Sequence, residues 1–221
     1  MPESTESSGT GGSAGNTGNA GSAGSAGSAG NQEIPDLGEK RILFIVTGSI
    51  NAALTPYWLH WLRQSFPRIT SDLLVTRSAQ RFVTLDALRR LVGGDVWTDD
   101  YADPSLPESA HVEIGERVDA FAVFPATLDF AMRLAAGNCN TPATMALQIT
   151  DKPIVLATAF PAGNAVVERN MELLLQRPNV SVSQTVAAYS VGKRKWEGET
   201  GFYLPSVLKE LEGMFDAEGR R

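Results

Sequence analysis

The chain has 221 residues, of which 25 are acidic and 19 basic, and its net charge is −6 at pH 7. This balance argues against a nucleic-acid-binding surface, and no apolar run approaches the roughly 20 residues that cross a bilayer. The single cysteine, Cys139, excludes an intrachain disulfide and a cysteine-based metal site, so we expect no metal. The N-terminus lacks the pattern of a secretory signal, which favours a cytoplasmic protein.

The first part of the chain differs in composition from the rest. Residues 1–36 are mostly Gly, Ser, Ala, Asn and Thr, and the triplet Gly-Ser-Ala repeats within 21–30. So little apolar surface cannot offset the entropy lost on ordering a backbone, and we therefore predict a disordered tail over 1–36. Residues 37–221 suit a single domain with one sizeable core.

Apolar runs alternate with amphipathic segments along this domain. Strands are predicted at 41–46, 72–76, 119–124, 153–159 and 180–182, and helices at 55–66, 84–92, 128–136, 166–176 and 204–215. Thr55-Pro56 is a typical helix start, and Gly137 is a typical helix end. The alternation predicts an α/β fold: a single doubly wound, Rossmann-like parallel sheet with helices on both faces.

Polar residues follow the first two predicted strands, at the edge where a parallel sheet binds ligands. Thr47-Gly48-Ser49 follows the first strand, and Thr76-Arg77-Ser78 follows the second. A glycine at such a turn lets backbone amides approach a phosphate, and a hydroxyl can donate to it. The pattern is neither Gly-x-Gly-x-x-Gly nor a Walker loop, so a plain tight turn stays the alternative to phosphate binding.

Histidine and cysteine are rare in this chain. His111 follows a polar, proline-containing loop and is a candidate catalytic residue, with a structural role as the alternative. His60 lies among tryptophans and leucines of a helix and is predicted to be packed or on the surface. Two histidines without matching ligand spacing predict no zinc site. A buried, unreactive thiol is the expectation for Cys139.

Lys193, Arg194 and Lys195 form a basic cluster between Gly192 and Gly201. A solvated surface hairpin and a flap that meets an anionic substrate both fit this pattern.

Five motifs occur in a fixed order within residues 40–215. They are Gly48-Ser49-Ile50, Thr76 to Val83, Ala110-His111-Val112, Pro125 to Phe130, and Pro161 to Glu168. In this order they resemble the homo-oligomeric flavin-containing cysteine decarboxylases. That family includes phosphopantothenoylcysteine decarboxylase and the peptidyl-cysteine decarboxylases of lantibiotic and related ribosomal peptide pathways.

The resemblance implies a flavin cofactor, FMN in most members, with FAD as the alternative. A phosphate site would come from the turns after the first two strands, and the later Pro-Ala-Thr turn would lie near the flavin ring and ribityl chain. The residues implied to bind the cofactor are Gly48, Ser49, Thr76, Ser78, Phe82, Pro125, Ala126 and Thr127.

The resemblance also implies a reaction. The substrate thiolate expels a hydride from Cβ to the flavin and becomes a thioaldehyde. The electrons that departing CO2 leaves behind then enter the C=S group, and an enethiolate forms. His111 would assist the loss of CO2, and Asn164 would orient the carboxylate. The basic cluster Lys193, Arg194 and Lys195 would bind the substrate.

Several positions depart from the family pattern. Asp129 stands where the family carries asparagine, and Gly163, Val167 and Glu168 replace Met, Met and Trp. These departures bear on the substrate lid that the resemblance also implies. His111 and Asn164 are retained, which argues against the alternative of a non-catalytic flavin-binding regulatory subunit.

One absence separates the two main branches of the family. Enzymes of coenzyme A synthesis carry a flap cysteine that reduces the enethiol, and residues 183–203 contain no cysteine. We therefore predict oxidative decarboxylation of the C-terminal cysteine of a precursor peptide to an enethiol, for aminovinyl-cysteine formation. Phosphopantothenoylcysteine decarboxylase is the alternative. Because the family's flavin lies at a subunit contact, the resemblance also implies a homotrimer or a homododecamer.

Overall fold

The computed structural model describes residues 35–158, 160, 163–190 and 194–220. The predicted tail over 1–36 therefore lies almost entirely outside the described residues, and its disorder stays a prediction. Among the described residues, no helix is long and apolar enough to cross a membrane.

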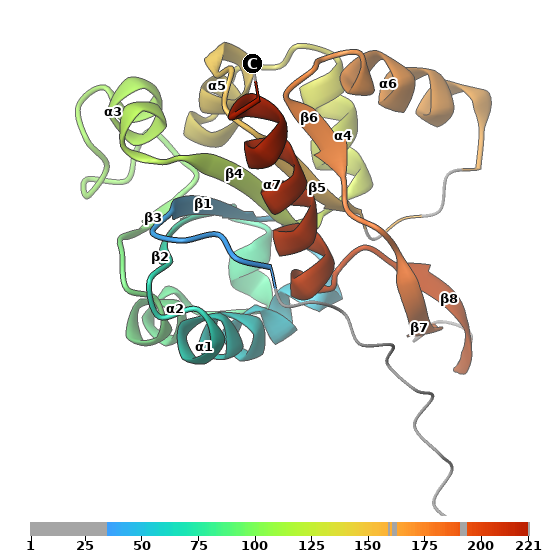
Figure 1. Ribbon diagram of the computed structural model, residues 1–221, viewed down its shortest axis with the longest axis horizontal. Coiled ribbons are helices and arrows are strands. Elements are labelled where there is room, and N and C mark those ends of the chain that lie inside the picture. Colours follow the sequence, from blue (N-terminus) through green and yellow to red (C-terminus); the bar gives the residue numbers. More distant parts are fainter. Residues whose placement is uncertain (1–34, 159, 161–162, 191–193, 221) are drawn as a thin grey trace, which may run out of the picture. The chain divides into compact units, whose positions relative to one another are not determined.

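Six parallel strands form one sheet with the order β3-β2-β1-β4-β5-β6 (Figure 1). The strand order reverses between β1 and β4, and open parallel sheets bind ligands at such a point. This sheet confirms the predicted doubly wound, Rossmann-like fold. The strands are β1 (Arg41–Val46), β2 (Thr70–Val75), β3 (Val96–Thr98), β4 (Ala120–Ala126), β5 (Ile154–Thr158) and β6 (Val180–Val182).

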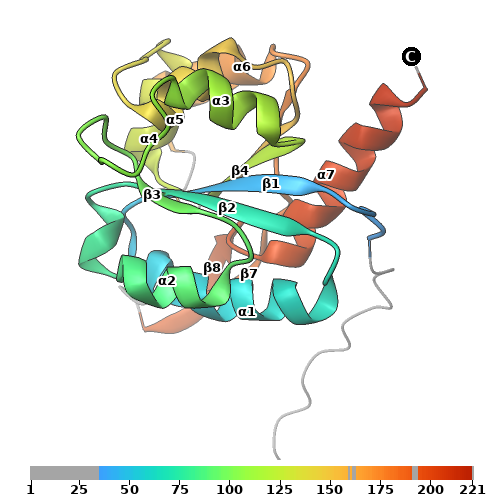
Figure 2. The same ribbon diagram turned by 90° about the vertical axis from the view of Figure 1, so that its left-hand side faces the viewer.

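Helices cover both faces of the sheet, as predicted (Figure 2). One face is covered by α1 (Thr55–Ser65), α2 (Leu85–Leu91) and α7 (Leu204–Glu218). The other is covered by α3 (Ala110–Arg117), α4 (Leu128–Ala135), α5 (Pro142–Ile149) and α6 (Ala165–Leu175). Two short 3-10 helices, η1 (Ile50–Leu54) and η2 (Ala79–Arg81), follow β1 and β2.

The central strand β1 is apolar at every position after its first residue, Arg41, because both of its faces are covered. Ile42, Phe44 and Val46 pack into the core beneath α1, α2 and α7. Leu43 and Ile45 point the other way, into the core beneath α3, α4 and α5. Successive side chains of a strand point to opposite faces, so a strand covered on both faces is apolar at nearly every position.

An antiparallel hairpin of β7 (Val186–Ser190) and β8 (Lys195–Thr200) follows β6 and projects away from the sheet (Figure 1). Its base is fixed to the carboxyl end of β5, because the amide of Gly201 donates to the carbonyl oxygen of Thr158 at 2.7 Å. The hydroxyl of Ser183 donates to the carbonyl of Gly201 at 3.0 Å. A Cβ at position 201 would lie 2.9 Å from the Thr158 nitrogen, so this close approach requires glycine.

Aromatic side chains hold the segment after the hairpin against β4 and α1. The ring of Phe202 stacks on Phe124, with the centroids 4.1 Å apart. Tyr203 meets Trp58 of α1 edge-to-face at 5.4 Å. Such pairs stabilise a core beyond the area that they bury, so the base of the hairpin is part of the main core.

The sequence prediction did not include β3, α3 or α5. β3 has three residues and the two helices have eight each, which is too short for a clear apolar period. A start signal for α5 is nevertheless present, because Thr141 caps the helix and Pro142 is its first residue. Thr55-Pro56 correctly located α1, but the predicted capping role of Thr55 is wrong, because Thr55 is the first residue of the helix and its hydroxyl makes no capping hydrogen bond to any described residue.

Candidate active site

The hydroxyl of Thr47 joins the carboxyl ends of the two strands that flank the switch point. It donates to the carbonyl oxygen of Pro125 at 2.6 Å and accepts from the amide of Thr127 at 3.0 Å. Thr47 is 2 % exposed, so these contacts form out of water. They fix the turn after β1 relative to the end of β4, and residues at both places belong to the predicted cofactor site.

The turns after β1 and β2 are brought together as predicted. A Cβ built on Gly48 would lie 2.4 Å from the Cβ and Oγ of Ser78, so the two turns are in direct contact. The hydroxyl of Thr76 lies 3.1 Å from that of Ser78 and accepts from the amide of Ala79 at 3.2 Å. Hydroxyls and amides of the two turns therefore gather at one point of the sheet edge.

Two buried hydroxyls beside this point have no protein partner among the described residues. They are Oγ of Ser49 and Oγ1 of Thr55, which lie on either side of η1. A buried hydroxyl without a hydrogen bond is costly, and a bound phosphate is one group that satisfies such donors. Together with the glycine that permits close approach, the orphaned Ser49 hydroxyl fits the phosphate of a flavin nucleotide.

A cleft of about 310 Å³ opens beside Thr76 and Ser78 and extends to Asp99 and Arg133. The Asp99 side chain accepts from the amide of Ala143 at 2.8 Å, at the first turn of α5. Burial raises the pKa of the Asp99 carboxyl, and this hydrogen bond offsets only part of the increase. Asp99 was not predicted, because it follows β3 and that strand was not recognised.

The remaining predicted cofactor residues lie at two places. Pro125 and Ala126 are the last two residues of β4 and are buried, and Thr127 caps α4 by accepting from the amide of Phe130 at 3.4 Å. The ring of Phe82, after η2, is 40 % exposed. Pro125, Ala126 and Thr127 are thus held at the switch point, whereas Phe82 lies at the surface.

His111 lies in the first turn of α3, where it lines a groove between α3 and α5. The groove has a volume of about 320 Å³, and the exposed side chains of Val112 and Ile149 make part of it apolar. His60, by contrast, is exposed on α1, which agrees with one of the two placements predicted for it.

Asn164 is exposed and begins α6, on a helix that packs against α4 rather than α3. Its side-chain oxygen accepts from the amides of Val166 and Val167, at 3.1 Å each. This is the geometry of a helix cap, which satisfies two amides of the first turn. The cap assigns the oxygen of Asn164 a structural role that the sequence did not predict.

Two residues of the basic cluster, Arg194 and Lys195, lie where the β7–β8 hairpin enters β8. Lys193 is outside the described residues. Arg194 is exposed and has a φ of 54°, and Lys195 begins β8 and forms an ion pair with Glu197. The predicted surface hairpin is therefore present, and substrate binding by this cluster stays a prediction.

The prediction of a buried thiol is wrong. Cys139 is exposed, and its thiol donates to the carbonyl of Gly137 at 3.2 Å. The residue lies in the short connection between α4 and α5, where no core is available to cover it. Among the described residues, no cluster of acidic, histidine or cysteine side chains could hold a metal ion.

Comparison with known proteins places these features in a family. The Flavoprotein family model matches residues 31–198. The chain is 44% identical over 175 residues to the cypemycin cysteine dehydrogenase (decarboxylating) of a Streptomyces species, and the match covers 79% of this chain and 91% of that protein.

Two of the solved structures with a similar fold are the following decarboxylases. The cypemycin decarboxylase CypD superposes with a TM-score of 0.71 at 42% identity, over 82% of this chain and 96% of that one. TvaF, an FMN-dependent cysteine decarboxylase from thioviridamide biosynthesis, gives 0.60 at 29% identity, over 66% and 91%.

Proposed function

This chain belongs to the Flavoprotein family and is a flavin-dependent cysteine decarboxylase, and we propose that it converts the C-terminal cysteine of a precursor peptide to an enethiol. The reaction serves the biosynthesis of a ribosomally made peptide. The observation that carries this function is the 44% identity to the cypemycin enzyme over 91% of its length. The enethiol would then react further to give aminovinyl-cysteine.

FMN is the cofactor, as in the related decarboxylase TvaF. Gly48, Ser49, Thr76 and Ser78 would hold its phosphate, since their hydroxyls and amides converge at the carboxyl ends of β1 and β2. When bound, the flavin accepts the hydride removed from Cβ of the substrate cysteine. The protein supplies the position of the substrate and the groups around its carboxylate.

His111 and Asn164 would act on the substrate carboxylate. The oxygen of Asn164 already accepts two amides of α6, so its amide nitrogen is the group left to donate to a carboxylate. An N–H of His111 would donate to the same carboxylate and keep it in place until CO2 leaves. The electrons of the broken bond pass to the thiocarbonyl sulfur, and the enethiolate then takes up a proton.

A homotrimer, or a homododecamer built from trimers, would complete this site. In one copy of the chain, His111 and Asn164 lie on helices that pack against different neighbours. Apolar side chains are exposed both beside His111 and next to the turn after β1; they are Val112, Ile149, Ile50, Leu54 and Tyr57. Contact between such surfaces of two copies would bury them. Light scattering that finds a monomer with bound flavin would contradict this assembly.

The argument against other functions, and the expected location of the protein, rest on the amino-acid sequence alone. The flap region contains no cysteine to reduce an enethiol, which argues against phosphopantothenoylcysteine decarboxylase. Cys139 lies between α4 and α5, outside the hairpin. A cytoplasmic location stays a prediction.

The test begins with the absorbance spectrum of the purified protein and the mass of the compound released on denaturation. We expect a yellow protein that releases FMN and that releases CO2 from a peptide ending in cysteine. His111→Asn should keep the flavin and reduce CO2 release to a small residual rate, and the matched control His60→Asn, on the exposed face of α1, should keep both the flavin and the full rate. Full turnover by His111→Asn would remove the catalytic assignment.

A further inference from the structure

The C-terminal end of α3 is held by a lysine from the segment before β5. Nζ of Lys152 donates to the carbonyl oxygens of Gly115, Glu116 and Val118, at 2.8, 3.0 and 2.5 Å. These carbonyls belong to the last turn of the helix and to its cap, where intrahelical donors are missing. A cation at this end also complements the helix dipole.

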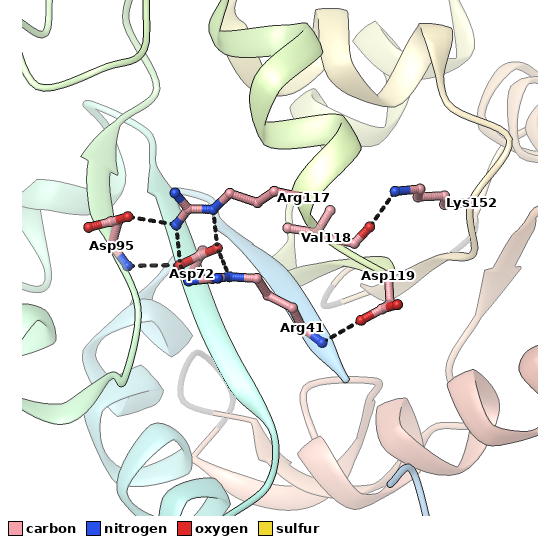
Figure 3. A network of polar contacts seen from close by, with 7 residues as sticks. All are labelled: Arg41, Asp72, Asp95, Arg117, Val118, Asp119 and Lys152. Atoms are coloured by element: carbon pink, nitrogen blue, oxygen red, sulfur yellow. Dashed lines mark hydrogen bonds and ion pairs between the residues drawn. The ribbon is translucent and has the colours of Figure 1, made fainter. Parts of the chain in front are cut away.

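Arg117, the last residue of α3, ties the same end to the sheet (Figure 3). Its guanidinium donates from Nε and Nη2 to both carboxylate oxygens of Asp72, at 3.2 and 2.9 Å. Nη2 also donates to Asp95 at 2.6 Å, and the guanidinium carbon lies 5.0 Å from the centre of the Trp97 ring. Arg41 donates to the same two oxygens of Asp72, at 2.7 Å from its Nε and 3.3 Å from its Nη2.

Stability alone does not explain such a cluster. Asp72 is fully buried in β2, and buried ion pairs can often be replaced by apolar groups without loss of stability. A bidentate arginine–carboxylate contact does, however, fix the orientation of the two side chains relative to each other. The pair between Arg117 and Asp72 therefore sets where α3 lies along the sheet.

The other end of α3 carries His111. Among the described residues, none forms a hydrogen bond with its imidazole, so the position of the ring depends on the backbone of α3. The helix has eight residues and is about 12 Å long, so a shift at Arg117 reaches His111.

We propose that Arg117 is a positioning residue, which acts through Asp72 to hold α3 and thereby His111 at the substrate carboxylate. The proposal rests on the proposed function, which assigns His111 to the loss of CO2. A displacement of about 1 Å in a catalytic group can cost 10²-fold in rate, so even a small shift of α3 would be measurable.

The test compares Arg117→Met, Arg117→Lys and the control Arg89→Met. Arg89 forms an exposed ion pair with Asp86 on α2, away from α3. We expect Arg117→Met to lower kcat for a peptide ending in cysteine by about tenfold or more, with KM and flavin content within about twofold of wild type. Arg117→Lys should recover part of kcat, and Arg89→Met should match wild type. An unchanged kcat in Arg117→Met would overturn the proposal.

A double-mutant cycle separates positioning from a general structural role. If Arg117 acts through His111, Arg117→Met should have no further effect on the residual rate of His111→Asn. Two independent, additive losses would overturn the proposal. If Arg117→Met does not fold, the same double-mutant cycle is measured with Arg117→Lys. A wild-type kcat in Arg117→Lys would then overturn the proposal.

A readout independent of turnover separates this proposal from the decarboxylase function itself. The chain has two histidines, so the imidazole NMR signal of His111 is assigned by its loss in His111→Asn. The chemical shift of that signal should change in Arg117→Met and remain unchanged in Arg89→Met, whatever substrate the enzyme accepts. An unmoved signal would overturn the positioning role, whereas absent CO2 release by the wild-type protein would overturn only the function.

Discussion

The backbone of Gly48 lies against the side chain of Ser78, so that a methyl group at position 48 would be 2.4 Å from the Ser78 Cβ. Gly48→Ala therefore forces the turns after β1 and β2 apart, since real Cβ contacts are not this short. We expect the variant to bind FMN with much reduced occupancy and to melt at a lower temperature. The flavin-to-protein absorbance ratio and a thermal melt measure both effects.

The matched control for that variant is Gly93→Ala, in the exposed connection between α2 and β3. A Cβ on Gly93 would have nothing within 4 Å. Its flavin content should equal that of wild type, and its stability should change by less than about 0.5 kcal/mol. Full FMN occupancy in Gly48→Ala would mean that the two turns do not form the phosphate site.

Thr47→Val removes the hydroxyl that bridges β1 and β4. The carbonyl of Pro125 and the amide of Thr127 would both lose a buried partner. Leaving such groups unsatisfied costs about 1–3 kcal/mol each, so we expect urea unfolding at a clearly lower concentration. Thr47→Ser keeps the hydroxyl and should remain within about 1 kcal/mol of wild type. Equal losses in the two variants would contradict this role of the hydroxyl, because only Thr47→Val removes it.

The Asp72 carboxylate makes stability depend on pH in the acid range. Burial raises its pKa, but hydrogen bonds from Arg41 and Arg117 outweigh burial and hold the pKa below the usual value. A carboxyl whose pKa is lowered by folding contributes stability above its unfolded pKa of about 4. That contribution is lost as the pH falls from about 4 through the folded pKa.

Asp72→Asn should remove this contribution and leave two arginines without their counter-charge. We expect a loss of about 3 kcal/mol at pH 7 that shrinks as the solution is acidified below pH 4. Urea unfolding of both proteins between pH 7 and pH 3 gives the comparison. A difference that stays constant with pH would contradict the ionised state of Asp72 in the folded protein.

The basic residues of the hairpin are expected to bind the peptide rather than to stabilise the fold. Arg194→Ala and Lys195→Ala should raise KM for the peptide by a few fold, with an effect that weakens as salt is added. Melting temperatures should be unchanged, because both side chains are exposed. Lys209→Ala, an exposed position on α7, is the control; an equal change in KM there would refute a specific role for the hairpin.

The sequence predicted the parallel sheet and the turns that follow β1 and β2, because apolar strands and the polar residues after them are local features. The partners of Asp72 could not be predicted. Arg41 lies 31 residues before it and Arg117 lies 45 residues after it, so only the folded sheet brings them together. The helix that carries His111 was missed for a related reason, since α3 is short and its end is held by Lys152 from a distant segment.

The separate attachment of the β7–β8 hairpin has a consequence for how such enzymes diversify. Its base is attached to the sheet by the hydrogen bond from Gly201 to Thr158 and by the stacking of Phe202 on Phe124. Arg194, at the other end of the hairpin, is exposed to solvent. Residues near Arg194 can therefore be replaced, or the loop lengthened, without any change in the sheet or in the turns beneath it. Under the proposed role of Arg194 and Lys195 in peptide binding, changes in this hairpin would alter the peptide preference while the turns after β1 and β2 stay the same.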